Sequence, residues 1–439
     1  MGFQTMTARR LPRRRQAGDI STARGPVTMG IARRATLLLA IAVAGVAQPA
    51  PGPCHTPYPF GWSEPEAQAV SSQELLELTR WVLQERPPLL SLLISRNGRI
   101  VYELYTSSIT RSEAHYVMSV TKSVTSALVG VAVGEGLLQG PEQTIANGLP
   151  RDVFPNEESY RRFRSVTLKD VLAMSALDAP VAPHLRTVEA QRRLEAFFSA
   201  PNRVAFALSQ GLLPRLGLDF QYTDVTPSLA AGMVEYNAHA TLLDLAKRTL
   251  FGPMSFEHEE WMHEDKSRID NAAYGLRLRP VDMQKFGVLF LNGGCWDGQQ
   301  LVPRDWVDLS FTPWIRSRPG RPLPDYGWYW WQRDYAGETA HVADGWKGQR
   351  IAVLPGKRMV VTMTAIAGDG DEGYIVRSIM ERAAAAVSKG SSPTAAADVS
   401  HALHTALREV NALRLVPNGA EYRMLPSAKQ KERHVAWKE

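Results

Sequence analysis

Apolar and polar residues follow a pattern that predicts strands at both ends of the folded part of the chain. Residues 75–83 have helical spacing, and two apolar runs at 89–95 and 100–105 flank Asn97-Gly98. An Asn-Gly pair between two such runs is the strongest short hairpin signal. Further strands are expected towards the other end of the chain, at 326–331, 339–343, 350–354 and 359–364.

The middle of the chain has a different pattern. From 142 to 270 the periodicity is mostly helical, with connections marked by proline and no evident pair of strands. Helices are also expected at 282–292 and 303–309, and at 374–387, where a helix would cover the sheet. This order of strands, helices and strands predicts an α+β fold, with an antiparallel sheet flanked by helices and a mostly helical insert between its first and last strands.

Composition changes at several points suggest how the chain is divided. No internal repeat is visible, and 44% hydrophobic with 21% charged residues is typical of a globular protein. The last part has one amphipathic stretch, 395–413, to which we assign no activity. The expected parts are a targeting segment at 1–47, a Pro-rich linker at 48–69, one domain at 70–388 (sheet parts 70–135 and 271–388, helical insert 136–270) and a C-terminal extension at 389–439.

The positive charge of the chain is concentrated at its start. The formal net charge is +6, but residues 1–47 hold eight arginines and a single acid, Asp19, so that segment carries +7 and the remainder −1. A basic groove for nucleic acid would need the excess on the folded part. We therefore expect no nucleic-acid partner.

The first segment has the features of a signal peptide. Arg33 and Arg34 precede an apolar run at 35–47 that ends in small residues. The run is shorter than the roughly 20 residues needed to span a bilayer. The arginine pair admits a twin-arginine route, and Met29 offers an alternative start to Met1. We expect an exported protein, periplasmic or secreted; the alternative is an uncleaved N-terminal segment that anchors it to the membrane.

The two cysteines are too few for a disulfide scaffold. An exported protein could join them. Because Cys54 lies in the Pro-rich stretch and Cys295 near a turn, we expect two independent thiols.

Ser119 and Lys122 stand three residues apart at the start of an apolar stretch. On a helix, such residues project from one face and their side chains can meet. Serine is a weak nucleophile unless a neighbouring group removes its proton. Lys122 could do so if its amine is neutral, a state that burial and nearby positive charge favour. The spacing alone is common, so the pattern needs support from elsewhere in the chain.

That support comes from a resemblance that covers roughly residues 70–390. The chain resembles the serine hydrolases of the penicillin-recognising superfamily, in the class C β-lactamase-related branch that includes the 6-aminohexanoate-dimer hydrolases and related esterases. This resemblance implies a β-lactamase/transpeptidase-like fold. The segments that carry it are Ser-Val-Thr-Lys at 119–122, the helix ending Met-Ser at 166–175, Gln-Tyr-Thr-Asp at 221–224, the block 274–294 and Ala-Asp-Gly-Trp at 343–346.

The resemblance also implies roles for these residues in acyl transfer. Ser119 would attack a carbonyl with Lys122 as base, and Tyr222 would pass a proton to the leaving group and then help water attack the acyl-enzyme. The backbone N–H groups of Ser119 and Trp346 would hold the oxyanion, and such donors are typically worth roughly 3–4 kcal/mol each. Gly345 belongs to the same substrate-binding strand end.

Three positions depart from the family's pattern. Asp224 replaces the usual asparagine, and either orients Lys122 or caps the next helix. Ala176 replaces a glycine, and Asp344 stands in a strand motif that usually reads Lys-Thr-Gly or His-Thr-Gly. Because a lysine there suits a substrate carboxylate, its absence favours amide or ester hydrolysis of a small molecule over β-lactamase or carboxypeptidase activity.

No cofactor or metal is expected. Residues 257–265 contain two histidines among acids, but His258 and His263 are five positions apart, which separates them by about 140° on a helix. We interpret this stretch as a solvated surface segment. Two other functions stay open: a peptidoglycan-directed D-alanyl-D-alanine carboxypeptidase or β-lactamase, and a catalytically degenerate module that only binds.

Overall fold

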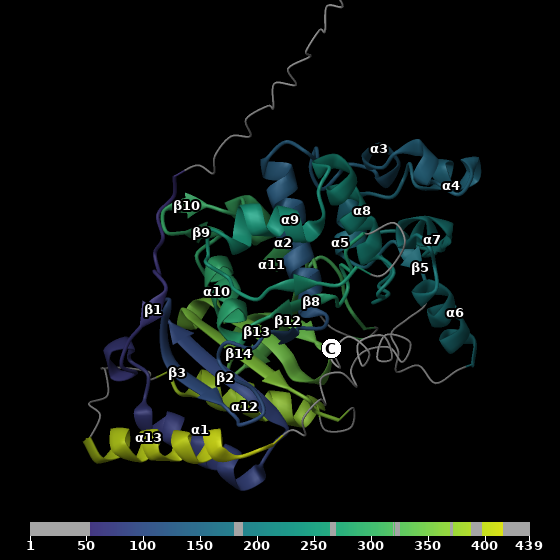
Figure 1. The fold of residues 1–439 in the computed structure, drawn as a ribbon. Coiled ribbons are helices and arrows are strands. Elements are labelled where there is room, and N and C mark those ends of the chain that lie inside the picture. Colours follow the sequence, from purple (N-terminus) through teal and green to yellow (C-terminus); the bar gives the residue numbers. More distant parts are fainter. Residues whose placement is uncertain are drawn as a thin grey trace, which may run out of the picture. The chain divides into compact units, whose positions relative to one another are not determined.

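The computed structural model describes residues 53–179, 188–263, 269–318, 320, 325–368, 372–387 and 397–415 (Figure 1). The expected targeting segment at 1–47 lies outside the described residues. Within the described part, no helix combines the length and the apolar character needed to cross a membrane.

A seven-stranded sheet forms the centre of the described part, with strand order β1-β3-β2-β14-β13-β12-β11. All neighbours are antiparallel except β1 and β3. The early strand β2 lies beside β14, one of the last, which confirms a sheet built from both ends of the chain. The strands are β1 (Gly61–Trp62), β2 (Leu89–Arg96), β3 (Arg99–Tyr105), β11 (Trp331–Tyr335), β12 (Glu338–Gly345), β13 (Gln349–Leu354) and β14 (Met359–Ala365).

The predicted hairpin joins β2 to β3. Asn97 and Gly98 have φ angles of 50° and 75°, and two positive φ angles are what a two-residue type I′ turn requires. A Cβ on Gly98 would lie 2.2 Å from the carbonyl oxygen of Tyr58. Glycine is therefore needed here both for its backbone conformation and for the close approach of another segment.

One face of the sheet is covered by α1 (Ser72–Glu85), α12 (Glu372–Ala385) and α13 (Ala397–Ala412) (Figure 1). Alternate residues of β14 point to this side, such as Val361 and Met363, while Val360 points to the other. The helix α13 comes from the expected C-terminal extension. Its apolar stripe is buried against this face, with Val410 fully buried.

The other face carries α2 (Val120–Gly134) and α10 (Pro280–Leu291). The helix α10 lies close to the sheet at Gly287, where a Cβ would be 2.5 Å from Val360. The remaining helices are α3 (Ile145–Gly148), α4 (Glu157–Arg162), α5 (Leu168–Leu172), α6 (Val188–Phe198), α7 (Arg203–Ser209), α8 (Pro227–Ala238), α9 (Leu242–Ala246) and α11 (Arg304–Phe311). A short π-helix, Lys247–Phe251, continues α9.

Short strand pairs also occur that the sequence did not predict. Each strand has only two or three residues, too few for a period of two to be visible. They are β4 (His115–Tyr116), β8 (Leu276–Leu278) and β7 (Glu260–Trp261) in one sheet, β5 (Leu177–Asp178) with β6 (Gly211–Leu212), and β9 (Cys295–Trp296) with β10 (Gln299–Gln300).

The strand expected at 326–331 is not formed. Tyr329 has a φ angle of 63°, which interrupts any extended run, and its neighbours Trp328 and Trp330 are buried in an aromatic cluster. The strand β11 begins only at Trp331. The apolar side chains in this stretch fill the core from an irregular backbone, and periodicity cannot distinguish such a stretch from a buried strand.

The expectation of two independent cysteines is wrong, because Cys54 and Cys295 form a disulfide with a Cα–Cα distance of 6.1 Å. The Pro-rich segment lies along the domain at this point. The backbone N–H of Cys54 donates to the Gly298 carbonyl at 2.9 Å, and the Asn292 side chain bonds to both backbone polar groups of Tyr58. These contacts bring the Cys54 thiol to the β9–β10 hairpin.

Candidate active site

Ser119 lies at the N-cap of α2, directly after a turn that the protein holds in place. Met118 has a φ angle of 50°, an unusual value for a residue with a side chain. The Thr121 hydroxyl donates to the Met118 carbonyl at 2.7 Å and accepts from the Leu276 backbone N–H at 3.2 Å. This pairing fixes the turn to β8, so Ser119 is presented from a rigid support.

Lys122 lies one turn further along α2 and is 1% exposed. Its amine bonds to the Ser119 Oγ at 2.9 Å, the Asp224 Oδ1 at 2.7 Å and the Ala273 carbonyl at 2.9 Å. The structure therefore brings Ser119, Lys122 and Asp224 together. Of the two interpretations of Asp224, contact with Lys122 is the one that the geometry supports.

The charge of Lys122 differs from the expectation. Burial lowers the pKa of its amine, but the Asp224 carboxylate and Tyr222 raise it by more, so the pKa lies above its ordinary value. The predicted depression of this pKa is wrong, because it depended on nearby positive charge. The charge that the fold brings to Lys122 is negative.

The three partners nevertheless allow Lys122 to exchange a proton with Ser119. The Asp224 carboxylate and the Ala273 carbonyl can only accept hydrogen bonds, whereas the Ser119 hydroxyl can also donate. A neutral amine has two N–H donors and one lone pair. It could donate to Asp224 and Ala273 and accept from Ser119 without moving.

Tyr222 approaches the same hydroxyl from another direction. Its phenol interacts electrostatically with both Ser119 and Lys122, and the Lys122 amine lies 4.9 Å from the centre of its ring. Burial raises the pKa of the Tyr222 phenol and Lys122 lowers it, with the net pKa above its ordinary value. The phenol is therefore protonated at neutral pH and can donate a proton.

Gly345 is the last residue of β12 and Trp346 follows it, beside the turn that precedes Ser119. A Cβ on Gly345 would be 2.5 Å from the Val117 carbonyl oxygen, so only glycine fits at this point. The Trp346 side chain is partly buried against an apolar cluster that includes Met118 and Tyr274. This places the strand end predicted to hold the oxyanion next to the serine turn.

Asp344 is part of β12 but is bound to cations of the neighbouring strands. Its Oδ1 is 2.8 Å from Arg350 and its Oδ2 is 3.7 Å from Arg333. Its carboxylate does not contact Ser119 or Lys122 among the interactions that the described residues show. Asp344, expected from the sequence to belong to the substrate-binding end of this strand, is thus paired with arginines of the two adjacent strands.

Sequence reasoning missed two groups at the site. The Ala273 carbonyl is a backbone atom that no side-chain motif indicates, and Asn271 holds it in place by accepting from the backbone N–H groups of Ala273 and Tyr274. An Asn before small residues was the available signal for such a turn. The second missed group is the Arg350 side chain. Its position opposite Asp344 follows from the antiparallel register of β12 and β13.

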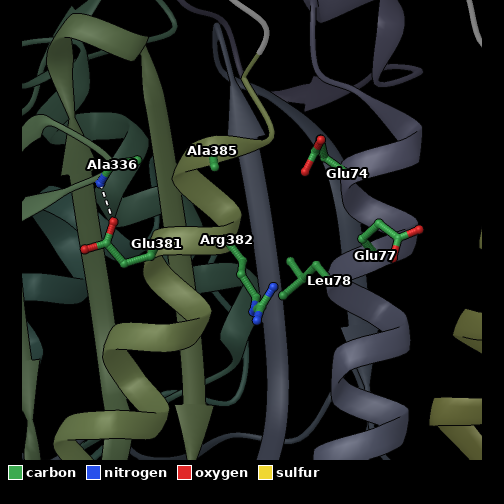
Figure 2. A pocket seen from close by; sticks show the side chains of 7 residues that line it. All are labelled: Glu74, Glu77, Leu78, Ala336, Glu381, Arg382 and Ala385. Carbon is green, nitrogen blue, oxygen red and sulfur yellow. Dashed lines mark hydrogen bonds between the residues drawn. The ribbon is translucent and has the colours of Figure 1, made fainter.

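The pocket in Figure 2 lies elsewhere. It has a volume of about 310 Å³ and lies between α1 and α12, where Glu74, Glu77 and Glu381 line it. None of its lining residues comes from the segments that form the site. In the described part of the acidic stretch, 257–263, Glu257 pairs with Arg279 and His263 with Asp270.

Comparison with known proteins identifies the class to which this fold and site belong. The sequence pattern of the Beta-lactamase family matches residues 79–384, more than half of the 439-residue chain. The chain therefore belongs to the β-lactamase family, whose members are usually serine hydrolases, and the resemblance expected from the sequence is confirmed.

Solved structures share the fold at low sequence identity. A candidate 6-aminohexanoate-dimer hydrolase from Bacillus anthracis is 20% identical, with a TM-score of 0.58 over 75% of this chain and 88% of its own. A penicillin-binding protein homologue from Caulobacter crescentus is 15% identical, with a TM-score of 0.54 over 71% and 97%. A class C β-lactamase mutant is 13% identical, with a TM-score of 0.52 over 72% and 96%.

Proposed function

We propose that this protein is an exported serine hydrolase that cleaves an amide or ester bond of a small molecule through an acyl-enzyme at Ser119. The observation that carries the proposal is the position of the Ser119 hydroxyl, which bonds to the Lys122 amine at 2.9 Å and interacts with the neighbouring Tyr222 phenol. A nucleophile in contact with both a proton acceptor and a proton donor is what a two-step acyl transfer needs.

In the first step, the Ser119 Oγ attacks the substrate carbonyl while its proton passes to a neutral Lys122 amine. The negative charge that develops on the carbonyl oxygen would be held by the backbone N–H groups of Ser119 and Trp346. When the tetrahedral intermediate collapses, Tyr222 gives its proton to the leaving amine or alcohol and recovers one from Lys122. The acyl group stays on Ser119.

In the second step, a water molecule attacks the acyl-enzyme. As its oxygen bonds to the acyl carbon, its proton passes to Tyr222, which gives its own proton to the neutral Lys122 amine, and the same two N–H groups again hold the oxyanion. Collapse returns a proton to the Ser119 oxygen and releases the carboxylic acid. No group other than water is consumed.

Two observations bear on the substrate and the compartment. The strand end that faces the serine turn has Asp344, bound to Arg350, where a lysine could capture a carboxylate, and this favours an uncharged amide or ester over a β-lactam. The Cys54–Cys295 disulfide fits an oxidising compartment, as expected if residues 1–47 direct export.

The test is covalent labelling with a fluorophosphonate probe, together with turnover of a p-nitrophenyl ester. The native protein should be labelled and active, and Ser119→Ala should be neither. Ser126→Ala is the matched control, since Ser126 lies two turns along the same helix and its hydroxyl has no hydrogen-bond partner among the described residues. Failure to label the native protein would contradict the proposal and favour a binding module. Stable acylation by a penicillin probe would favour the penicillin-binding alternative.

A further inference from the structure

Arg350 is a buried cation whose position the proposed chemistry does not yet explain. It lies on β13 opposite Asp344 and is 6% exposed. One terminal nitrogen of its guanidinium donates to the backbone carbonyls of Gly345 and Gln349. The other is 2.8 Å from both the Asp344 and the Glu372 carboxylates.

These contacts occupy the four N–H groups of the two terminal nitrogens, out of five N–H donors in the side chain. A substrate carboxylate could bind Arg350 end-on only by displacing one of them. Moving the Arg350 guanidinium and its two carboxylate partners out of water costs desolvation energy. These ion pairs are therefore weak evidence that Arg350 serves stability alone. The geometry therefore calls for a different role.

The Gly345 carbonyl belongs to the same peptide group as the Trp346 N–H. A peptide group is planar and normally trans, so its C=O and N–H point in opposite directions and turn together. A hydrogen bond from a cation to the carbonyl fixes the direction of the N–H. It also polarises the peptide group, which makes the N–H a stronger donor.

This peptide group begins at a residue that lies against the segment leading to the serine. Gly345 is so close to the Val117 carbonyl that no side chain fits between them, and Val117 is two residues before Ser119. With Arg350 on the carbonyl side, the N–H is directed away from the guanidinium.

We propose that Arg350 is a positioning residue, held by Asp344 and Glu372, that fixes the Gly345–Trp346 peptide group so that the Trp346 N–H serves as an oxyanion donor. This inference rests on the proposed acyl transfer at Ser119. It also explains the departure at Asp344, since a carboxylate on β12 opposite Arg350 anchors the guanidinium where a lysine would repel it.

The test compares Arg350→Gln with the native protein on a p-nitrophenyl ester. Loss of a whole oxyanion donor costs about 10²–10³ in kcat, so loss of its orientation should lower kcat by about 10- to 100-fold. KM should change by less than about twofold. A phenylboronic acid that forms a tetrahedral adduct with Ser119 should bind more weakly by about the same factor as the loss in kcat/KM.

Two further variants make the result specific. Arg350→Lys, which keeps a cation within reach of the Gly345 carbonyl, should recover part of the loss. Arg377→Gln is the matched control, because Arg377 is an exposed arginine of α12 that pairs with Glu381. It should behave as the native protein does.

Native kcat in a folded Arg350→Gln protein would overturn the inference, as would a loss of kcat with unchanged boronate affinity. If Arg350→Gln does not fold, Glu372→Gln provides the test instead, since it keeps the guanidinium and removes one of the two carboxylates that hold it. A joint fall in kcat and boronate affinity in this variant would support the inference, and native values for both would overturn it. Absence of ester turnover and of Ser119 labelling in the native protein would instead refute the proposed function.

Discussion

The Lys122 amine lies 2.7 Å from the Asp224 carboxylate, and both side chains are buried. Opposite charges that are this close and shielded from water interact strongly. The carboxylate therefore holds the proton on Lys122 in the resting protein, although the proposed acyl transfer needs the neutral amine. Asp224 both orients the base and sets the pH at which it can act.

Replacement of this carboxylate should move the pH profile. Catalysis requires loss of a proton from Lys122 and the pKa of Lys122 is raised, so kcat/KM of the native protein should rise about tenfold per pH unit until that pKa is reached. Asp224→Asn removes the largest influence that raises the pKa, so the rising limb should shift to lower pH. Asp219→Asn, which alters a surface pair with Arg215, should leave the limb in place. An unmoved limb in Asp224→Asn would contradict this assignment.

Removal of the Tyr222 hydroxyl should impair chemistry more than folding. Tyr222→Phe keeps the ring that packs against Tyr326 and Trp331, so thermal unfolding should be close to that of the native protein. Loss of a proton donor typically costs about 10²–10⁴ in rate. The loss should be larger for an anilide than for a p-nitrophenyl ester, whose leaving group needs no proton. Equal losses on both substrates would argue against proton donation, and Tyr236→Phe on α8 serves as the control.

A methyl group at Gly345 should disturb the site. In Gly345→Ala the new Cβ would lie 2.5 Å from the Val117 carbonyl oxygen and 3.0 Å from the Gln349 Cβ, so the strand end must move away from the serine turn. We expect kcat/KM to fall by more than about tenfold and stability by about 1–3 kcal/mol. Gly373→Ala, where a Cβ meets nothing within 4 Å, should retain native kinetics. Native kinetics for Gly345→Ala would show that the close approach is unimportant.

The disulfide should contribute measurably to stability. Cys54 and Cys295 are 241 positions apart, and a bond that closes a long loop restricts the unfolded chain. The double variant Cys54→Ser, Cys295→Ser should lose about 2–4 kcal/mol of unfolding free energy in urea titrations. A reductant should lower the stability of the native protein to the same value and leave the variant unchanged. A reductant effect of equal size on both proteins would point to another cause.

Local patterns were sufficient to predict much of this protein. The hairpin at Asn97-Gly98 follows from two neighbouring runs and a turn dipeptide, and the meeting of Ser119 with Lys122 follows from the pitch of one helix. The family resemblance supplied Tyr222, whose contact with Ser119 spans about a hundred residues. No spacing within a single element could have placed it there.

Features that depend on distant segments were predicted less well. The raised pKa of Lys122 depends on Asp224, which the sequence could place near the amine but could not show to outweigh burial. The bond between Cys54 and Cys295 depends on how a proline-rich segment runs along the domain. At Tyr329 a single positive φ angle interrupts an apolar run that reads as a strand. Each of these depends on tertiary contacts that periodicity does not contain.

The order of strands in the central sheet has a consequence for synthesis. Ser91 of β2 and Thr364 of β14 share a hydrogen bond although they are 273 positions apart. During synthesis, β2 and β3 leave the ribosome long before β14, the strand that pairs with the free edge of β2. Because such distant pairing must wait for its partner, the nascent sheet stays incomplete until nearly the whole domain has emerged. Fragments that stop before Met359 should therefore be degraded rather than accumulate as folded protein.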